Sequence, residues 1–152
     1  MVASPEALPI EFYRQGDAYG FLSNFAPYPI ELDGKTWPTT EHYFQAQKFR
    51  GTPSEERVRA APSPGDAARM GRSLPGLRAD WEAVKDEVML VALRAKFGQH
   101  AKLRRLLLET GERPLVEHTG NDRYWADGGD GAGENRLGEL LVQVREELRT
   151  SG

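Results

Sequence analysis

The sequence predicts an α+β fold that is predominantly α-helical, with a small antiparallel β-sheet or hairpin in a single compact domain. Long stretches in the second half of the chain repeat apolar residues at helical spacing. Asp33-Gly34 separates two short segments and suits a two-residue hairpin turn. The length of 152 residues is that of one domain, without an internal repeat or a long linker. We therefore expect a flexible N-terminus over residues 1–9 and one domain over residues 10–150.

The first third of the chain holds the expected strands and one unusual helix. Residues 10–13 favour a short strand, and residues 28–37 favour the hairpin. Pro38 and a following threonine, either Thr39 or Thr40, then supply a helix start for the run EHYFQAQKF, which should end near Gly51.

The rest of the chain is expected to be mainly helical. Two short helices should follow, one over residues 54–61 and one opened by Ser63-Pro64, where serine caps and proline fits the first turn. After the link SLPGLR, apolar spacing predicts further helices and one extended segment between the last two of them. These helices should cover residues 80–97, 101–109 and 134–149, with the extended segment at residues 114–119.

Composition excludes several classes of protein. The absence of cysteine rules out disulfides, thiolate zinc sites and a cysteine nucleophile. The apolar runs are much shorter than the ~20 residues that cross a bilayer, so no membrane association is expected. The first ten residues lack the features of a secretory signal, which predicts a cytoplasmic location. A net charge of −3 argues against a large basic face for duplex nucleic acid but leaves room for a local phosphate pocket.

Histidine and nucleophile motifs are also missing. His42, His100 and His118 lack metal-ligand spacing, so we expect no bound metal, and His118 is expected to act through hydrogen bonds. Neither a G-x-S-x-G elbow nor a Walker loop is present.

The helix EHYFQAQK carries the first candidate chemistry. Glu41, Gln45 and Lys48 follow one another at i, i+4 and i+7 and so share a helix face. This face is either a solvated stripe of polar side chains or a partly buried acid and amine with pKa values suited to catalysis. The neighbouring aromatic residues favour burial.

The run YWADGGDGAGENR, residues 124–136, places a glycine-rich loop before the last helix. Its backbone amides would suit an anion, although a flexible turn is the plainer interpretation. The glycine spacing differs from that of a dinucleotide-binding loop, and an EF-hand is excluded. Trp125 and Asp127 offer an aromatic face and a carboxylate to a base and its sugar.

Two further features have ordinary explanations. Ser23 and Asn24 lie between aromatic residues in FLSNFAPYPI, where local capping is the simpler role. Trp81 opens an apolar helix face, where tryptophan usually belongs to the core.

At this point the sequence resembles the NADAR family, and in particular its bacterial branch linked to riboflavin intermediates. The resemblance rests on SNFAPYPIELDGKTWPTTEHYFQAQKF, ARMGRS, LRADWEAVKDEVMLVALRAKF and LVEHTGNDRYWADGGDGAGENRLGELL, and covers residues 12–148. The family's common WGDG is WADG here, with Ala126 in place of glycine.

The resemblance implies an N-glycosidase that cleaves the ribose C1–nitrogen bond of aminoribosyl-pyrimidine phosphates, without a cofactor. It implies Glu41, Lys48 and Asp127 as catalytic residues. By analogy with the paired acids of glycoside hydrolysis, our hypothesis is that Glu41 transfers a proton and that Asp127 stabilises charge or orients water. Lys48 either binds phosphate or forms a Schiff base with the sugar. The expected substrate-binding residues, which we expect to converge with these on one ligand, are Ser23, Asn24, Phe25, Trp81, His118, Trp125, Gly128, Gly129, Asn135 and Arg136.

Two alternatives remain at the level of sequence. Other members of the family look like hydrolases of ADP-ribosylated guanine, in which case a nucleic acid is a possible partner instead of a small molecule alone. A non-catalytic module that binds ADP-ribose or a related nucleotide is the other. Release of free base from each ligand separates an enzyme from such a module.

Overall fold

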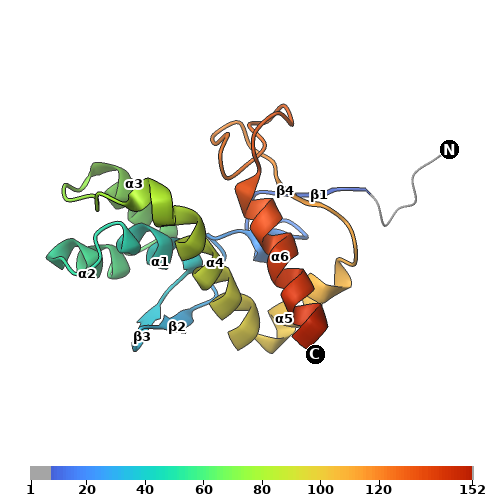
Figure 1. The fold of residues 1–152 in the computed structure, drawn as a ribbon, viewed down its shortest axis with the longest axis horizontal. Helices are drawn as coiled ribbons and strands as arrows, with labels where there is room; N and C mark the ends of the chain where they lie inside the picture. Colours follow the sequence, from blue (N-terminus) through green and yellow to red (C-terminus); the bar gives the residue numbers. More distant parts are fainter. Residues whose placement is uncertain (1–7, 152) are drawn as a thin grey trace. The chain divides into compact units, whose positions relative to one another are not determined.

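The computed structural model describes residues 8–151, which form a set of helices and a few short strands (Figure 1). The last two residues of the N-terminal segment 1–9 are described, and the others lie outside the described residues. The predicted helix-rich α+β fold is confirmed. In order, the elements are β1 (Ile10–Phe12), the 3₁₀ helix η2 (Gly20–Leu22), β2 (Ile30–Leu32), β3 (Lys35–Trp37), α1 (Thr40–Gln47), α2 (Pro53–Arg59), α3 (Pro64–Ser73), α4 (Trp81–Gln99), α5 (Ala101–Glu109), β4 (Leu115–Glu117) and α6 (Arg136–Ser151).

The chain divides into two units, which we name by their place in the sequence. The central unit is Asn24–Gln99 and contains β2, β3 and α1 to α4. The terminal unit combines the described residues up to Ser23 with those from His100 onward, and contains β1, η2, α5, β4 and α6. One domain over residues 10–150 stays a prediction.

The central unit begins with the predicted hairpin. β2 and β3 pair antiparallel, with Ile30 opposite Trp37 and Leu32 opposite Lys35. Asp33 and Gly34 both have positive φ angles, 56° and 74°, as a type I′ turn requires. The buried Trp37 ring fixes the hairpin further, because its indole N–H donates to the carbonyl of Leu32 at 3.0 Å.

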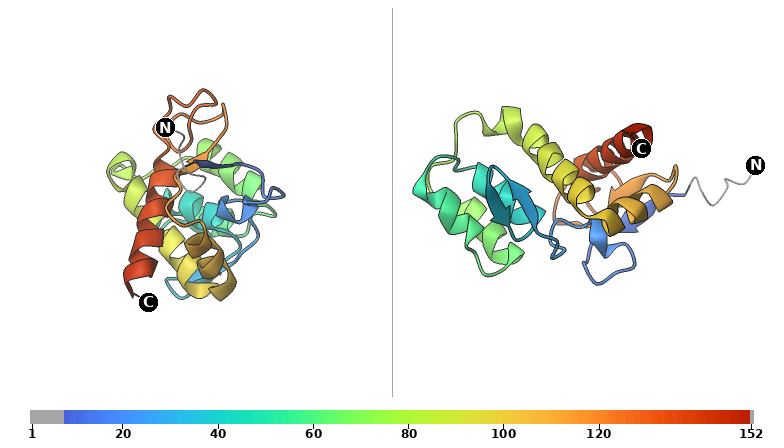
Figure 2. Two further views of the ribbon diagram at one scale, coloured as in Figure 1. Left: turned by 90° about the vertical axis from the view of Figure 1, so that its right-hand side faces the viewer. Right: turned by 90° about the horizontal axis from the view of Figure 1, so that it is seen from below.

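Helices α1, α2 and α3 pack around one apolar cluster, and the right-hand view of Figure 2 shows them gathered together. Thr39 caps α1 by accepting from the amide of His42, and Ser63 caps α3 by accepting from Asp66. The helix α1 ends at Gln47, earlier than expected, because the chain tightens there into turns that run on to Gly51. Buried members of the cluster include Ile30, Trp37, Tyr43, Ala46, Phe49, Val58, Ala67 and Ala92.

The terminal unit contains a strand pairing that the sequence analysis did not anticipate. β1 and β4 lie parallel, with Ile10 opposite Leu115 and Phe12 opposite Glu117. Helix α6 packs on β4, and α5 packs on α6. Gly138 permits the first of these contacts, since a Cβ at this position would lie 1.9 Å from the Leu115 carbonyl oxygen.

Among residues 8–151, no helix combines the length and the apolar character needed to cross a bilayer.

Candidate active site

The polar face of α1 is buried. Glu41 and Gln45 are 9% and 7% exposed, and the Gln45 side-chain amide donates to the Glu41 carboxylate at 2.7 Å. All eight residues of α1 are buried, so neighbouring segments enclose this helix on every side. The interpretation of a solvated polar stripe is therefore wrong, and the predicted shared face is confirmed.

The Lys48 amine continues this face at the end of α1. Its Nζ donates to the carbonyl of Gly71 on α3 at 3.4 Å and lies 5.8 Å from the centre of the Trp81 ring. Burial lowers the pKa of Lys48, and the charge of Glu41 opposes this effect. As a consequence, a larger fraction of the Lys48 amine is neutral than in an exposed lysine.

Trp81 completes the aromatic side of this group. Its ring meets that of Phe44 edge to face, with the ring centres 5.0 Å apart, and the side chain is 5% exposed. Trp81 therefore belongs to the core and also touches the site, so the two interpretations of this residue are compatible.

Asn24 joins the same unit through the start of α1. Its carbonyl oxygen accepts from the amide of Glu41 at 3.2 Å, and its side-chain oxygen accepts from the Thr40 hydroxyl at 2.8 Å. The Asn24 amide also donates to the sulfur of Met89. Asn24 thus fixes the position of Glu41 on the helix. The structure brings Asn24, Glu41, Lys48 and Trp81 together within the central unit.

His42, although it lies on α1, takes no part in this group. One ring nitrogen meets the Thr39 hydroxyl at 2.8 Å and the other meets the carbonyl of Ala61 at 3.0 Å. Burial lowers the pKa of His42, which favours the neutral ring that these two contacts fit.

Asp127 is the centre of the polar group in the terminal unit. It is 4% exposed, and its carboxylate accepts from the amides of Thr119 and Gly129 at 3.2 and 2.8 Å. The His118 ring donates to the second oxygen at 2.7 Å. Burial raises the pKa of Asp127, but these hydrogen bonds and the His118 charge outweigh it, and the net pKa is below the ordinary value.

His118 is correspondingly more basic than an ordinary histidine. Its hydrogen bond to Asp127, the Asp127 charge and the Glu11 charge all raise the pKa of His118. The Glu11 carboxylate on β1 lies 3.6 Å from the same ring nitrogen. Glu11, which the sequence analysis missed, reaches His118 through the parallel pairing of β1 with β4.

These three side chains are the one set among the described residues whose donor atoms suit a cation. One donor atom from each lies within 4.8 Å of the others. Within this set the His118 ring already donates directly to Asp127.

The glycine-rich loop joins β4 to α6 and is drawn in orange in Figure 1. Gly128 and Gly129 have positive φ angles of 74° and 84°. Their amides, like those of Ala132 and Gly133, donate to oxygen atoms of the same loop. These amides stabilise the loop itself, and so they do not favour the predicted anion cradle.

The flanks of the loop carry the other predicted residues of this unit. The Trp125 ring packs edge to face on that of Tyr124, with the centres 4.9 Å apart. The Asn135 side chain bonds the backbone at both ends of β4, accepting from Glu117 and donating to Leu115. Arg136 pairs with Glu139 on the first turn of α6. In the structure, Asn135 and Arg136 thus hold the start of α6.

Two predicted residues differ sharply in exposure. Ser23 is buried at the end of η2, whereas Phe25 is 38% exposed.

Asp122 was not among the predicted residues, although it accepts from the amides of Tyr124 and Trp125, both at 2.8 Å, and so shapes the loop. An aspartate two residues before an aromatic pair was the available signal.

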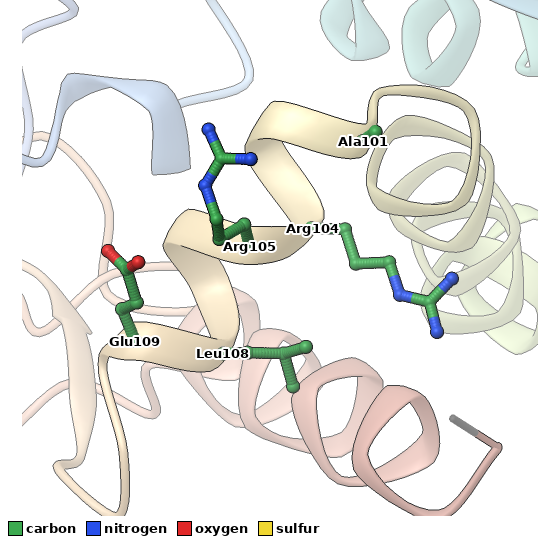
Figure 3. Close-up of a pocket in the computed structure, with 5 residues that line it drawn as sticks. All are labelled: Ala101, Arg104, Arg105, Leu108 and Glu109. Carbon is green, nitrogen blue, oxygen red and sulfur yellow. The ribbon is translucent and has the colours of Figure 1, made fainter.

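A hollow of about 320 Å³ lies on α5 and contains none of the predicted site residues. It is lined by Ala101, Arg104, Arg105, Leu108 and Glu109. Figure 3 shows the two arginine side chains pointing away from each other. They do not converge on a common point as ligand-binding groups would.

Comparison with known proteins covers nearly the whole chain. A family profile described as the NADAR domain matches residues 11–149. N-glycosidase YbiA of Escherichia coli (strain K12) is 61% identical over 141 residues, which are 91% of this chain and 88% of that protein. An N-glycosidase of Nostoc punctiforme is 44% identical, with 92% of each chain covered.

A riboflavin biosynthesis protein of Vibrio vulnificus is also 44% identical over 93% of this chain, which matches 39% of that longer protein. Among solved structures, the NMR structure of the E. coli protein YbiA superposes with a TM-score of 0.87. It is 58% identical, and the match covers 95% of this chain and 86% of that one.

Proposed function

As a member of the NADAR family the chain is an N-glycosidase, and we propose that it hydrolyses the C1–nitrogen bond of aminoribosyl-pyrimidine phosphates, intermediates of riboflavin biosynthesis. The name of the Vibrio vulnificus relative supports this substrate class. The observation that carries the proposal is the buried face of α1, where a carboxyl group and an amine of lowered pKa lie beside an indole ring.

Breaking a C1–nitrogen bond of a sugar makes two chemical demands. Positive charge grows on the ring carbon and oxygen, and the departing nitrogen must gain a proton. We assign Glu41 to proton transfer, since it is the buried acid next to the amine. Asp127 is held ionised by its donors, which suits it to stabilise positive charge or orient water rather than to give up a proton.

Lys48 has two possible roles, of which a nucleophilic one fits its surroundings better. A partly buried amine of lowered pKa is a better nucleophile than an exposed one, whereas binding a phosphate requires the charged form. In this route the Lys48 nitrogen forms a bond to C1 as the base departs with a proton. The sugar ring opens to an iminium ion, and water then releases the sugar and restores the amine.

In this proposal the aromatic residues recognise the base. Trp81 and Trp125 are assigned to stack on its flat face, a contact worth about 1–3 kcal/mol per base. The remaining predicted contacts, from Ser23, Asn24, Phe25, His118, Gly128, Gly129, Asn135 and Arg136, are proposed to bind the sugar and phosphate or to hold the groups that do.

A substrate panel tests the proposed function. The purified chain is incubated with an aminoribosyl-pyrimidine phosphate, with ADP-ribosylated guanosine and with NAD, and the released base is measured by chromatography. We expect clear turnover of the first compound. Exclusive turnover of ADP-ribosylated guanosine would assign the chain to the other activity, and binding without release would contradict hydrolysis altogether.

The role of Lys48 is tested by borohydride added during turnover. Reduction of an imine leaves the sugar attached to Lys48, where mass spectrometry of peptides locates it. Lys48→Arg keeps the charge but cannot form the adduct, and serves as the control. Efficient turnover without any adduct would favour the phosphate-binding role.

A further inference from the structure

The nitrogen and the oxygen of the Gln45 side-chain amide lie in very different environments. Its nitrogen donates to the Glu41 carboxylate at 2.7 Å. Its oxygen has no hydrogen-bond partner, although that atom is buried. Among the described residues it is the one buried side-chain polar atom left in this state. An unsatisfied buried acceptor is unfavourable, so its presence calls for an explanation in terms of function.

The unsatisfied oxygen lies against Gly71 of α3. A Cβ at residue 71 would stand 1.9 Å from this oxygen and 2.7 Å from the Gln45 amide carbon, so any side chain there would displace the amide. The Gly71 carbonyl also accepts from Lys48. Gly71 therefore lets α3 approach both the Gln45 amide and the Lys48 amine.

A glutamine side chain can form a hydrogen bond with either protonation state of a carboxyl group. Its N–H donates to a carboxylate, and after rotation by half a turn its carbonyl accepts from a protonated carboxyl group. A group that transfers protons passes through both forms. Leucine or methionine at position 45 would serve neither form, and glutamate would add a second acid.

We propose that Gln45 is the positioning residue of Glu41, that its amide serves both protonation states of that carboxyl group, and that Gly71 provides the space in which the amide does so. This inference rests on the proposed proton-transfer role of Glu41. It adds a residue that acts through Glu41 and, in the present assignment, does not touch the reacting atoms.

The first test replaces the amide. In Gln45→Leu, Glu41 loses the amide in both protonation states, but the bond to the ionised carboxylate is charge-assisted and is the stronger of the two. We therefore expect its titration midpoint to rise by about one to two pH units. Carbon-13 NMR of labelled glutamate measures this without substrate, and the limb of the pH profile of kcat/KM that reports Glu41 in the free enzyme should move equally. Gln45→Met is the second variant, should leucine prevent folding.

The matched control is Gln47→Leu on the same helix. Gln47 is buried as well, and its amide donates to Glu55 at 3.3 Å rather than to Glu41. Whatever its effect on stability, this variant should leave the Glu41 titration in place. A midpoint that moves in both variants, or in neither, would overturn the proposal.

The second test acts on the amide from the other side. Gly71→Ala should drive the Gln45 amide away from Glu41 and so reproduce the shift seen in Gln45→Leu. Gly65→Ala on the same helix meets only the Ser63 hydroxyl, at 3.8 Å, and should not. In a Gln45→Ala background the added methyl group meets no amide, so Gly71→Ala should shift the midpoint no further. Additive shifts would show that Gly71 acts independently of Gln45.

These measurements separate the failure of the inference from that of the proposed function. If no compound of the substrate panel is turned over, the titrations still decide whether Gln45 and Gly71 control Glu41. If turnover is normal and the midpoint stays in place in Gln45→Leu, the proposed function stands and the positioning role is wrong.

Discussion

The carboxyl group of Glu41 and the amine of Lys48 show how burial changes the meaning of a residue pattern. Both lie on a face whose spacing is common on solvated helices. In the structure the face is enclosed, and burial lowers the pKa of Lys48. His42 is buried on the same helix, yet both of its nitrogens bond to the protein. Burial alone therefore does not mark a catalytic group.

Replacing the acid tests its chemical role directly. Glu41→Gln keeps the size of the side chain and an oxygen that can accept from Gln45, but it removes the transferable proton. We expect kcat to fall by about 10²- to 10⁴-fold. The circular dichroism spectrum and melting temperature should change little. Near-normal turnover would rule out proton transfer by Glu41.

The contact of His118 with Asp127 predicts an elevated histidine pKa. The NMR titration of the His118 ring should have its midpoint above the ordinary value of about 6.5. Asp127→Asn should bring it back towards that value, and Glu11→Gln, which removes the more distant carboxylate, should lower it less.

The same contact has a definite sign in the pH dependence of stability. Because the pKa of His118 is raised in the folded chain, the contact stabilises the folded state fully below the unfolded value. This contribution is lost as pH rises through the folded value. A midpoint at or below the ordinary value would contradict the ion pair.

The helices were largely predictable because their signals are local. The helix expected over residues 101–109 is observed as Ala101–Glu109, and the hairpin turn falls at Asp33-Gly34. Ser63 caps α3 as its sequence context indicates. The end of α1 was harder to predict. The residues after Gln47 have a helical composition, but their backbone hydrogen bonds span three residues instead of four.

Long-range contacts were not predictable in the same way. The pairing of Ile10 with Leu115 joins strands that are far apart in the sequence. The sequence of a short apolar strand does not indicate which other strand it pairs with. The same applies to the site. The helical spacing of Glu41 and Lys48 was readable, whereas the contacts of Gly71 with Gln45 and of Glu11 with His118 needed coordinates.

Helix α6 makes its contact with β4 at Gly138, which gives a prediction about that pairing. Gly138→Ala would place a methyl group against the Leu115 carbonyl and the Asn135 amide, so we expect a loss of about 1–3 kcal/mol in the free energy of unfolding. Urea denaturation measures it. Gly98→Ala, at the end of α4, meets nothing within 4 Å and should be neutral or slightly stabilising.

The stability of the whole chain should depend on a buried lysine outside the candidate site. Lys96 is 1% exposed. Its Nζ lies 5.3 Å from the centre of the Phe97 ring and 5.9 Å from the centre of the Tyr28 ring. Burial lowers the pKa of Lys96 to about 7. Above that pH the folded chain holds a neutral amine, whereas the unfolded chain stays protonated up to about pH 10.4.

This difference in proton binding fixes the sign of the effect. The unfolded state binds more protons in that window, so the free energy of unfolding should rise with pH from about 7 towards 10 because of Lys96. Lys96→Met should remove this rise and stabilise the chain near pH 7, as measured by urea unfolding over a pH series. Lys102→Met, at an exposed position of α5, should leave the slope unchanged. An unchanged slope in Lys96→Met would contradict the assignment.

The pairing of β1 with β4 also imposes an order on how the chain is made. Strand β1 emerges early from the ribosome, but its partner and α6 follow only after all of Asn24–Gln99 has been synthesised. Domains made of contiguous sequence are free to fold during synthesis. The helices around Trp37 can therefore assemble while translation continues, whereas Ile10 must wait for Leu115 to be added.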